Sequence, residues 1–290
     1  MAEAHGKEIK ISLCIPAYNR PGELERCLIS VKKAKKKPWE VIVSDDSKEE
    51  VREKIKEICK KYGARYLPGP RKGLAMNEKN LVKNAKGNFI VFFGDDNQVT
   101  PEYFEEMEKN YLEYAEKYGE RIIITGKEIR DGVEVTPGEL TFLGYQAKEI
   151  EDRENAKAIV ICSTLFPKEF LDRVYFDPVL DYGLDEVDLV YQALYHGYRI
   201  IFCSSIINIH LRSPAGREKY HWMLERNRVY EMLKIYGVYQ RNILKFILYL
   251  FAGPLHLLLH AIKTWKFSLI KGIPSAMLNF YHFYRRWKWR

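Results

Sequence analysis

The amino-acid sequence predicts an α/β protein with a mostly parallel sheet flanked by helices and a helical tail at its C-terminus. Over the first 125 residues strand-like and helix-like segments alternate, as they do in sheets built through crossover helices. A chain of 290 residues suffices for one large domain with an appendage. After residue 231 there are ten Lys or Arg and no Asp or Glu, so the composition changes abruptly. We expect a catalytic-sized domain over residues 1–235 and a tail over residues 236–290.

Short apolar segments predict the strands of the first half. They are Ile11 to Ile15, Trp39 to Ser44, Ala64 to Leu67, Phe89 to Phe93 and Ile122 to Thr125. The helices between them have apolar residues three and four positions apart. The clearest sets are Leu24, Cys27, Leu28 and Val31 in one helix, and Phe104, Met107, Tyr111 and Tyr114 in another that begins at Thr100-Pro101.

Turn signals and a second strand-helix-strand set organise the rest of the domain. Residues 126–160 are polar and contain Asp131-Gly132 and Pro137-Gly138, which predict a hairpin and a surface excursion. A strand, a helix and a strand are then expected over residues 159–165, 184–196 and 199–203, followed by a charged helix from Gly216.

The distribution of charge argues against a nucleic-acid partner. The chain has 47 Lys or Arg and 39 Asp or Glu, so residues 1–231 carry a net charge of −2 and the tail carries the entire excess. Nucleic-acid binders usually spread basic residues over the folded domain. A tail that is both basic and aromatic instead favours an anionic membrane surface.

Cysteine usage and the N-terminus favour the cytoplasm. The five cysteines form no CxxC pair, and three lie in apolar segments, which is typical of a reducing compartment. The polar start of the chain lacks the apolar segment of a secretory signal.

Three predicted strands end in residues suited to ligand binding. The first ends in PAYNRP, residues 16–21, and has no glycine fingerprint of a dinucleotide-binding domain. The second ends in Asp45 and Asp46, and another in Asp95 and Asp96. Open α/β sheets bind ligands at this carboxyl edge. For the first acidic pair alone, capping of the next helix is an equal alternative.

Taken in order, these segments resemble family 2 glycosyltransferases of the nucleotide-diphospho-sugar transferase (GT-A) fold. The resemblance rests on ISLCIPAYNRPGELERCL, WEVIVSDDS, GLAMNEKNLVKNAKGNFIVFFGDDN, LDEVDLVYQALYHGYRI and IHLR, and covers roughly residues 8 to 235. It implies transfer of a sugar, with inversion, from a nucleotide-diphosphate sugar.

The resemblance also implies a nucleotide-sugar site. Ala17 and Tyr18 would line the base, and Asp45 or Asp46 would accept its imide hydrogen bond, which favours a UDP-sugar. Asp95 would lie nearer the ribose. Further contacts are expected from Pro16, Asn19, Arg20, Arg71 and Lys79, although solvated surface charge is an equal alternative for Arg71 and Lys79.

A metal site is implied next to it. Asp96, with Asp95, matches the family's metal motif, and hard carboxylate ligands suit Mg²⁺ or Mn²⁺ bound to a diphosphate. His210 lies where related enzymes supply another metal or phosphate contact, although a structural role is an equal alternative. Gly94 and Asn97 stand where the motif usually has Asp, which alters the expected coordination.

The general base is expected at the start of a helix. The family has Glu-Asp where this chain has Asp185-Glu186, followed by Asp188. Alignment with the family's Asp favours Glu186 as the group that takes the acceptor's proton, with Asp185 as the rival. Acids in a first helical turn also complement the helix dipole without any catalytic role.

The tail is expected to lie at the membrane interface. Residues 246–262 carry no formal charge, but they fall short of the about 20 residues of a spanning helix, and Gly253-Pro254 should interrupt them. A basic and aromatic belt follows, ending in residues 280–290. Packing of the apolar part against the catalytic domain is the alternative.

These observations together predict a metal-dependent transferase at the cytoplasmic face of the cell membrane, peripheral or monotopic through its tail. Its acceptor would be a lipid-linked or otherwise membrane-presented glycan. The alternative is a nucleotide-binding membrane scaffold of the same fold whose catalysis is impaired.

Overall fold

The computed structural model describes residues 8–180, 183–211 and 221–287. Asp181, the expected helix start at Gly216 and the last three residues of the aromatic belt lie outside these ranges. The helices are α1 (Pro21–Lys33), α2 (Glu49–Tyr62), α3 (Leu74–Asn84), α4 (Tyr103–Tyr118), α5 (Lys168–Leu171), α6 (Asp185–Tyr195), α7 (His221–Lys234), α8 (Ile243–Thr264) and α9 (Gly272–Trp287). Shorter turns are η1 (Ile161–Ser163), the π-helical η3 (Ile235–Tyr239) and η4 (Phe267–Lys271).

The strands form a nine-stranded sheet and a separate two-stranded one. They are β1 (Ile11–Ala17), β2 (Glu40–Asp45), β3 (Arg65–Pro68), β4 (Phe89–Phe92), β5 (Asn97–Val99), β6 (Ile122–Arg130), β7 (Val133–Val135), β8 (Glu139–Leu140), β9 (Gln146–Lys148), β10 (Thr164–Pro167) and β11 (Arg199–His210).

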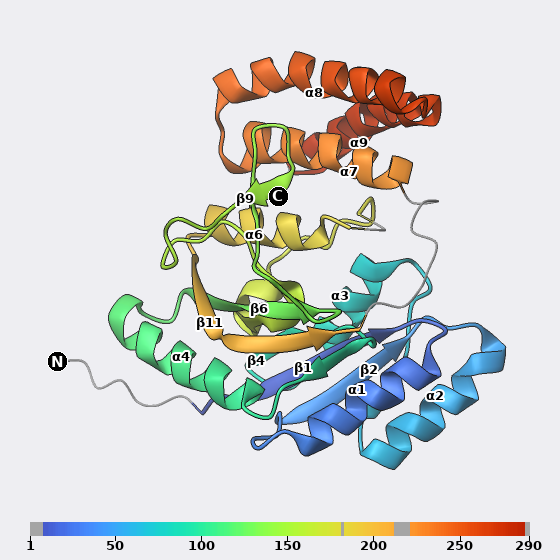
Figure 1. The fold of residues 1–290 in the computed structure, drawn as a ribbon, viewed down its shortest axis with the longest axis vertical. Coiled ribbons are helices and arrows are strands. Elements are labelled where there is room, and N and C mark those ends of the chain that lie inside the picture. Colours follow the sequence, from blue (N-terminus) through green and yellow to red (C-terminus); the bar gives the residue numbers. More distant parts are fainter. Residues whose placement is uncertain (1–7, 181–182, 212–220, 288–290) are drawn as a thin grey trace.

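The large sheet has the order β3-β2-β1-β4-β10-β6-β11-β5, with β7 beside β6. Strands β3, β2, β1 and β4 are parallel, as are β6 and β11, whereas β10 joins the two groups in antiparallel register. The predicted α/β class is therefore confirmed (Figure 1). The strand expected from Ile159 begins only at Thr164, because residues 161–163 form a 3₁₀ turn first.

Two hydrophobic cores cover the two faces of this sheet. Helices α1, α2 and α4 supply one, as the buried Leu24, Cys27, Leu28 and Val31 of α1 illustrate. Helices α3 and α6 supply the other, which continues without a break into α7, α8 and α9. The predicted helical periodicity therefore identified the core-facing residues correctly on α1.

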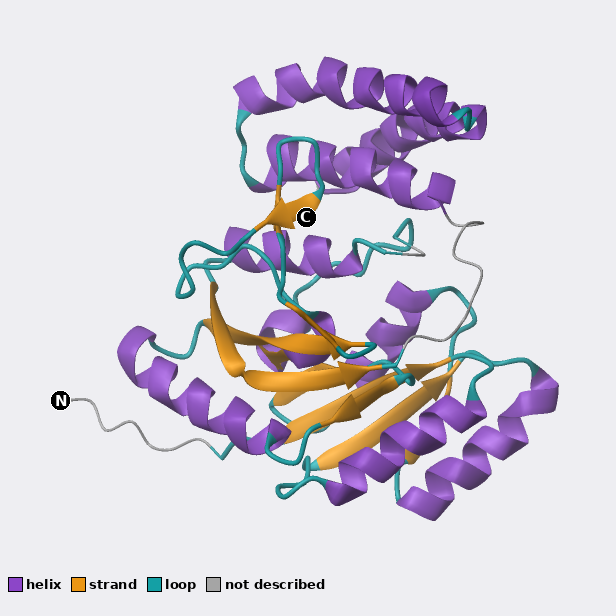
Figure 2. Cartoon of the chain, in the orientation of Figure 1, coloured by secondary structure: helices purple, strands orange, loops and turns teal. Residues whose placement is uncertain are grey.

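Helices α7, α8 and α9 form a bundle that stands on the far side of α6 from the sheet (Figure 2). Residues of the tail pack in its interior, among them Tyr249, Leu257 and Phe283. By length and composition, α8 is the one helix in the described ranges that could cross a membrane, and few of its residues are buried.

The expected interruption at Gly253-Pro254 was wrong, because α8 continues through Pro254. A proline removes one intrahelical hydrogen bond, but the rest of the helix can hold if it is packed. Gly253 lies against the Tyr249 ring so closely that a Cβ atom there would come within 2.7 Å of it. Burial of Tyr249, Leu257 and Ala261 then keeps the two halves of α8 in one helix.

A hairpin over residues 139–148 links the bundle to the sheet domain, as the green loop that ends at β9 shows (Figure 1). Phe142 at its tip stacks on Tyr236 with ring centroids 5.6 Å apart. The carbonyl of Leu143 accepts a hydrogen bond of 2.5 Å from Arg228 of α7. Both contacts hold the tip of the hairpin against η3 and α7.

Candidate functional site

The carboxyl ends of β1, β2 and β4 bring the first three motifs together. Ala17 pairs with Asp45 across the parallel β1 and β2 strands. Tyr18, the first residue after β1, has its backbone N–H 3.5 Å from Asp95, which follows β4. Parallel strands end at one sheet edge, which is why motifs separated by almost 80 residues meet here.

The two aspartates after β2 have different surroundings. Asp45 is fully buried, and its oxygens accept hydrogen bonds from the Ser47 backbone at 2.9 Å and the Tyr66 hydroxyl at 3.1 Å. Asp46 is half-buried and accepts a hydrogen bond of 2.7 Å from the Arg71 backbone N–H. Burial raises the pKa of the Asp46 carboxyl. Asp46 therefore has the carboxylate that a ligand can reach.

The turn after β1 is fixed by a pair of reciprocal contacts. The Asn19 backbone donates to Ser47 Oγ at 2.7 Å, while the Lys48 backbone donates to Asn19 Oδ1 at 2.9 Å. Asn19 has φ 55°, a left-handed conformation that asparagine tolerates better than most residues. The geometry leaves Tyr18 57% exposed above the sheet edge, where a flat base can stack on it.

Arg20 bridges both acids of the second motif. Its guanidinium lies 2.5 Å from Asp95 Oδ1 and 2.8 Å from Asp96 Oδ2. Burial raises the pKa of Asp95 to about 7, although the charge of Arg20 opposes that shift. Burial also disfavours the charged form of Asp96, but His210 and Arg20 outweigh it and hold the pKa of this carboxyl below its usual value.

His210, at the end of β11, completes this cluster. Its Nε2 lies 3.7 Å from Asp96 Oδ1, and its Nδ1 lies 3.2 Å from Glu128 Oε2. Hydrogen bonding to Asp96 and Glu128 raises the pKa of His210 to about 9. A carboxylate behind the imidazole orients the ring and increases its basicity as a ligand.

The chemistry of these groups fits a divalent cation. Asp95 and Asp96 supply hard carboxylate oxygens, which Arg20 also contacts, and His210 supplies a nitrogen. Within the described ranges, no three His, Cys, Asp or Glu side chains are already grouped to hold a metal. A metal here would need further ligands from the diphosphate or from water.

The two departures from the usual motif form one packing unit. Asn97 is buried, donates to Cys162 Sγ at 3.0 Å and accepts from Asn208 at 3.1 Å. A Cβ atom at Gly94 would come within 2.7 Å of the Asn97 amide and 3.0 Å of Asp96 Oδ1. Gly94 therefore makes room for the inward-turned Asn97, and neither change removes Asp95 or Asp96 from the edge.

The three acids at the start of α6 have two kinds of surroundings. Glu186 Oε1 accepts a hydrogen bond of 2.9 Å from Gln146 Nε2, and Asp185 lies beside it in a half-buried position. Burial and the charge of Glu186 raise the pKa of Asp185 to about 8. Asp188 instead points into the protein, where Lys234 Nζ lies 2.7 Å away.

Sequence reasoning missed Glu78 on α3. It is 3% exposed, and burial together with the charges of Asp185 and Glu186 raises its pKa well above the usual range. It also lines a small cavity with Asp185, so α3 and α6 meet at their first turns. The available signal was an acid three residues after the buried Ala75, on the apolar face of the helix.

The remaining predicted contacts are looser. Arg71 is exposed and pairs with Glu49 at 3.0 Å, and it has φ 54°. Lys79 is half-buried on α3. Pro16 is half-buried within β1 and pairs with Ser44. These residues surround the sheet edge, but the contacts of Arg71 are those of ordinary surface charge.

Comparisons with known proteins identify related sequences and folds. The family model described as glycosyl transferase family 2 matches residues 12–174. A stretch of 110 residues, 36% of this chain, is 27% identical to glycosyltransferase GlyA of Streptococcus pneumoniae, of which it covers 15%. A stretch of 123 residues, 39% of this chain, is 29% identical to the GalNAc(5)-diNAcBac-PP-undecaprenol beta-1,3-glucosyltransferase of Campylobacter jejuni, of which it covers 38%. The matched segments thus span well under half of these relatives.

Among solved structures, GalNAc-T7 with UDP, GalNAc and Mn²⁺ is similar at a TM-score of 0.60 and 15% identity. The alignment covers 80% of this chain and 48% of that one. At this identity the likeness concerns the fold, and it confirms the predicted GT-A architecture.

Proposed function

This chain belongs to glycosyl transferase family 2, and from that premise we propose that it is an inverting, metal-dependent transferase of a sugar from a nucleotide diphosphate to a lipid-linked or membrane-presented glycan acceptor. The observation that carries the proposal is the shared sheet edge. There, Asp46, Asp95, Asp96 and His210 gather beside Tyr18. Such an edge can hold a base, a diphosphate and a cation.

The donor's nucleotide would lie on the turn after β1. Its base would stack on the exposed Tyr18, and an imide N–H would donate to Asp46, whose carboxylate only accepts. A UDP-sugar is favoured because uracil has that N–H. The related fold of GalNAc-T7 was solved with UDP, which supports this choice.

Asp96 and His210, with Asp95 behind them, would hold Mg²⁺ or Mn²⁺. Bound there, the cation offsets the negative charge that develops on the departing diphosphate. Arg20 pairs with Asp95 and Asp96, so it keeps two like charges together at the edge. It is also placed to contact the diphosphate by its planar donor fork.

Glu186 would act as the general base. As the acceptor oxygen bonds to the anomeric carbon, its proton passes to Glu186 and the bond from that carbon to the diphosphate oxygen breaks. A single displacement inverts the anomeric centre. Asp185 is the poorer base at neutral pH, because its pKa of about 8 keeps it protonated.

The bundle supports a membrane-presented acceptor. Helix α8 exposes large apolar side chains along its length, including Ile243 at 70%, Phe251 at 73% and Leu259 at 56%. Contiguous exposed apolar surface of this kind marks interaction with a membrane or a partner. With the excess cations of the tail, it favours peripheral or monotopic association with the cytoplasmic face of the cell membrane. The Campylobacter relative is named for an undecaprenol-linked acceptor.

One observation favours a second function, a nucleotide-binding scaffold without catalysis. Arg20 pairs with both Asp95 and Asp96, so it offsets part of their negative charge without a metal. Hydrolysis of UDP-, GDP- and dTDP-sugars, each with Mn²⁺ and with chelator, separates the two functions. Metal-dependent hydrolysis of one donor supports the transferase, whereas nucleotide binding without any turnover supports the scaffold.

A further inference from the structure

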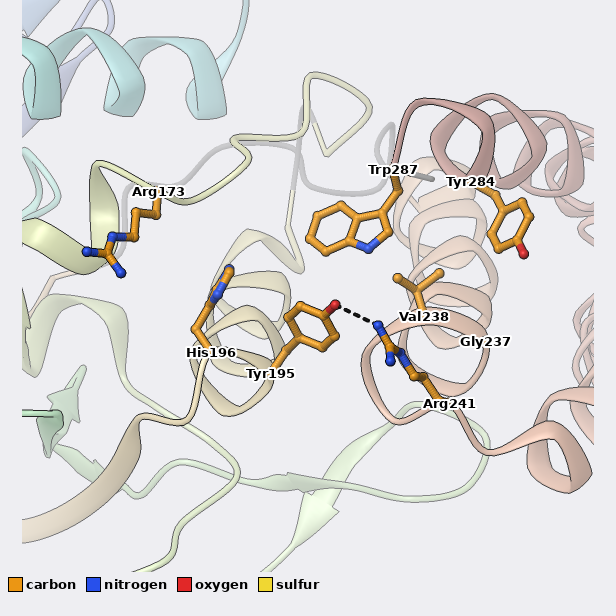
Figure 3. Close-up of a pocket in the computed structure, with 8 residues that line it drawn as sticks. All are labelled: Arg173, Tyr195, His196, Gly237, Val238, Arg241, Tyr284 and Trp287. Carbon is orange, nitrogen blue, oxygen red and sulfur yellow. Dashed lines mark hydrogen bonds between the residues drawn. The ribbon is translucent and has the colours of Figure 1, made fainter. Parts of the chain in front are cut away.

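A cavity of about 670 Å³ lies away from the sheet edge, at the opposite end of α6 from Asp185. Tyr195 and His196 come from the end of α6, Arg241 follows η3, and Trp287 ends α9 (Figure 3). An 11-residue helix is about 16 Å long, so this cavity is separate from the proposed catalytic groups.

The cavity has a positive lining. Arg173 and Arg241 line it from opposite sides, and no acidic side chain is among the described residues that line it (Figure 3). Neither arginine has a carboxylate within 4 Å in the described part of the chain. The cavity therefore carries positive charge without a counterion among the described residues, and the planar donor fork of Arg241 suits a phosphate.

Arg241 is held in place for such a role. Its guanidinium donates a hydrogen bond of 2.9 Å to the Tyr195 hydroxyl, which Figure 3 draws as a dashed line. The guanidinium also lies 5.5 Å from the centre of the Tyr195 ring. Its backbone has φ 51°, the left-handed region that costs energy for a residue with a side chain. The turn between η3 and α8 thus positions one cation against an aromatic wall.

A second, more apolar cavity of about 290 Å³ adjoins the first, and the two share Gly237, Arg241 and Tyr284. Ile243 and Phe246 of α8 and Phe280 of α9 line its other side. Phe246 and Phe280 have ring centroids 5.6 Å apart. The charged cavity therefore adjoins an apolar slot that includes Ile243, the first residue of α8.

We propose that the two cavities form one site for an anionic phospholipid, whose phosphodiester binds Arg241 and whose first acyl segment enters the slot. The inference rests on the proposed membrane association and names its lipid partner. A soluble phosphate would use only the charged half. A zwitterionic lipid would bring its own cation towards Arg241, which disfavours it.

The test uses the full chain and water-soluble short-chain lipids below their micelle concentration. Calorimetry compares dihexanoyl phosphatidylglycerol, dihexanoyl phosphatidylcholine and glycerol phosphate. Arg241→Gln removes the cation at the cavity. Arg285→Gln is the matched control, because Arg285 also donates to a tyrosine hydroxyl, that of Tyr281, but lies outside the cavity.

The proposal predicts tightest binding of the phosphatidylglycerol. Arg241→Gln should weaken it by about tenfold or more, and Arg285→Gln by less than about twofold. Ile243→Gln should weaken binding of the phosphatidylglycerol but leave binding of glycerol phosphate unchanged. An equal loss of lipid affinity in the two arginine variants would overturn the proposed site, and so would equal binding of the two lipids. If glycerol phosphate binds as tightly as phosphatidylglycerol, the site belongs to a soluble phosphate instead.

A separate measurement distinguishes this site from the proposed function. Sedimentation of the wild-type chain with phosphatidylcholine vesicles, with and without phosphatidylglycerol, reports membrane association itself. If the wild type sediments with neither kind of vesicle, the proposed membrane association is wrong, and the lipid assignment is wrong with it. If it sediments but Arg241→Gln and Arg285→Gln behave alike, only the lipid site fails.

Discussion

Gln146 Nε2 donates a hydrogen bond of 2.9 Å to Glu186 Oε1, and this contact joins the bundle-linked hairpin to the proposed base. The same hairpin has its tip, Phe142, against Tyr236 and Tyr249 of the bundle. Helix α8, with its exposed apolar side chains, and the proposed base are therefore separated by one short segment of chain. An acceptor held at the membrane would approach Glu186 along this side.

The first prediction concerns the base. Glu186→Gln keeps the shape and the contact with Gln146 but cannot take a proton, so transfer should fall by roughly 10²-fold or more while donor affinity stays unchanged. Asp185→Asn should reduce transfer far less. Initial rates and donor titrations of both variants measure this. The opposite order of effects would assign the role to Asp185.

The second prediction concerns the metal. Asp96→Ala removes the carboxylate that lies 3.7 Å from His210 Nε2, so the Mn²⁺-dependent part of UDP binding should disappear while the fold survives. Calorimetry with UDP, with and without Mn²⁺, measures it. Asp172→Ala is the control, since that exposed acid pairs with Lys168 at 2.7 Å outside the site. Unchanged metal dependence in Asp96→Ala would exclude Asp96 as a ligand.

The third prediction is a pH dependence of stability. The pKa of Asp185 is raised to about 8, so between about pH 4 and pH 8 the folded chain keeps a proton that the unfolded chain has released. This makes the free energy of unfolding fall as pH rises through that window. Asp185→Asn should be more stable than the wild type at pH 8 and not at pH 4. Urea unfolding at both pH values checks this, and an equal difference at both would refute it.

The fourth prediction concerns Lys234, which is fully buried and lies within about 3 Å of Asp177, Asp188 and Glu231. Lys234→Met leaves three acids without their cation and should destabilise the chain by about 3–5 kcal/mol. Lys54→Met, an exposed lysine of α2, should change stability by less than about 0.5 kcal/mol. Chemical denaturation compares them, and a similar small effect for both would contradict a coupled cluster.

The fifth prediction tests the exposed face of α8. Phe251→Glu with Leu255→Glu places two charges on one apolar stripe, and sedimentation with anionic vesicles should fall by roughly tenfold or more. Leu112→Glu, at a 50% exposed leucine of α4, is the matched control. Binding of the wild type should weaken in salt without vanishing. Substitution is cleaner than a chain that ends at Val238, because such a chain would also lose the buried Tyr249, Leu257 and Phe283.

Local patterns in the sequence were enough for the strand ends and the family. Alternation of apolar segments depends on residues a few positions apart, so it predicted β1, β2, β4 and the acids that follow them. Pairing along parallel strands then carries Tyr18, Asp46 and Asp95 to one edge without further information. The basic tail was equally plain, because charge is a property of composition.

Only the tertiary structure decided which of these side chains face one another. Arg20 bridges acids about 75 residues away, and Asp188, which the motif places beside Glu186, turns inward to Lys234. Pro254 stays within a helix because distant packing outweighs one lost hydrogen bond. Burial, long-range ion pairs and packing depend on residues far apart in the chain, whereas sequence periodicity records only neighbours.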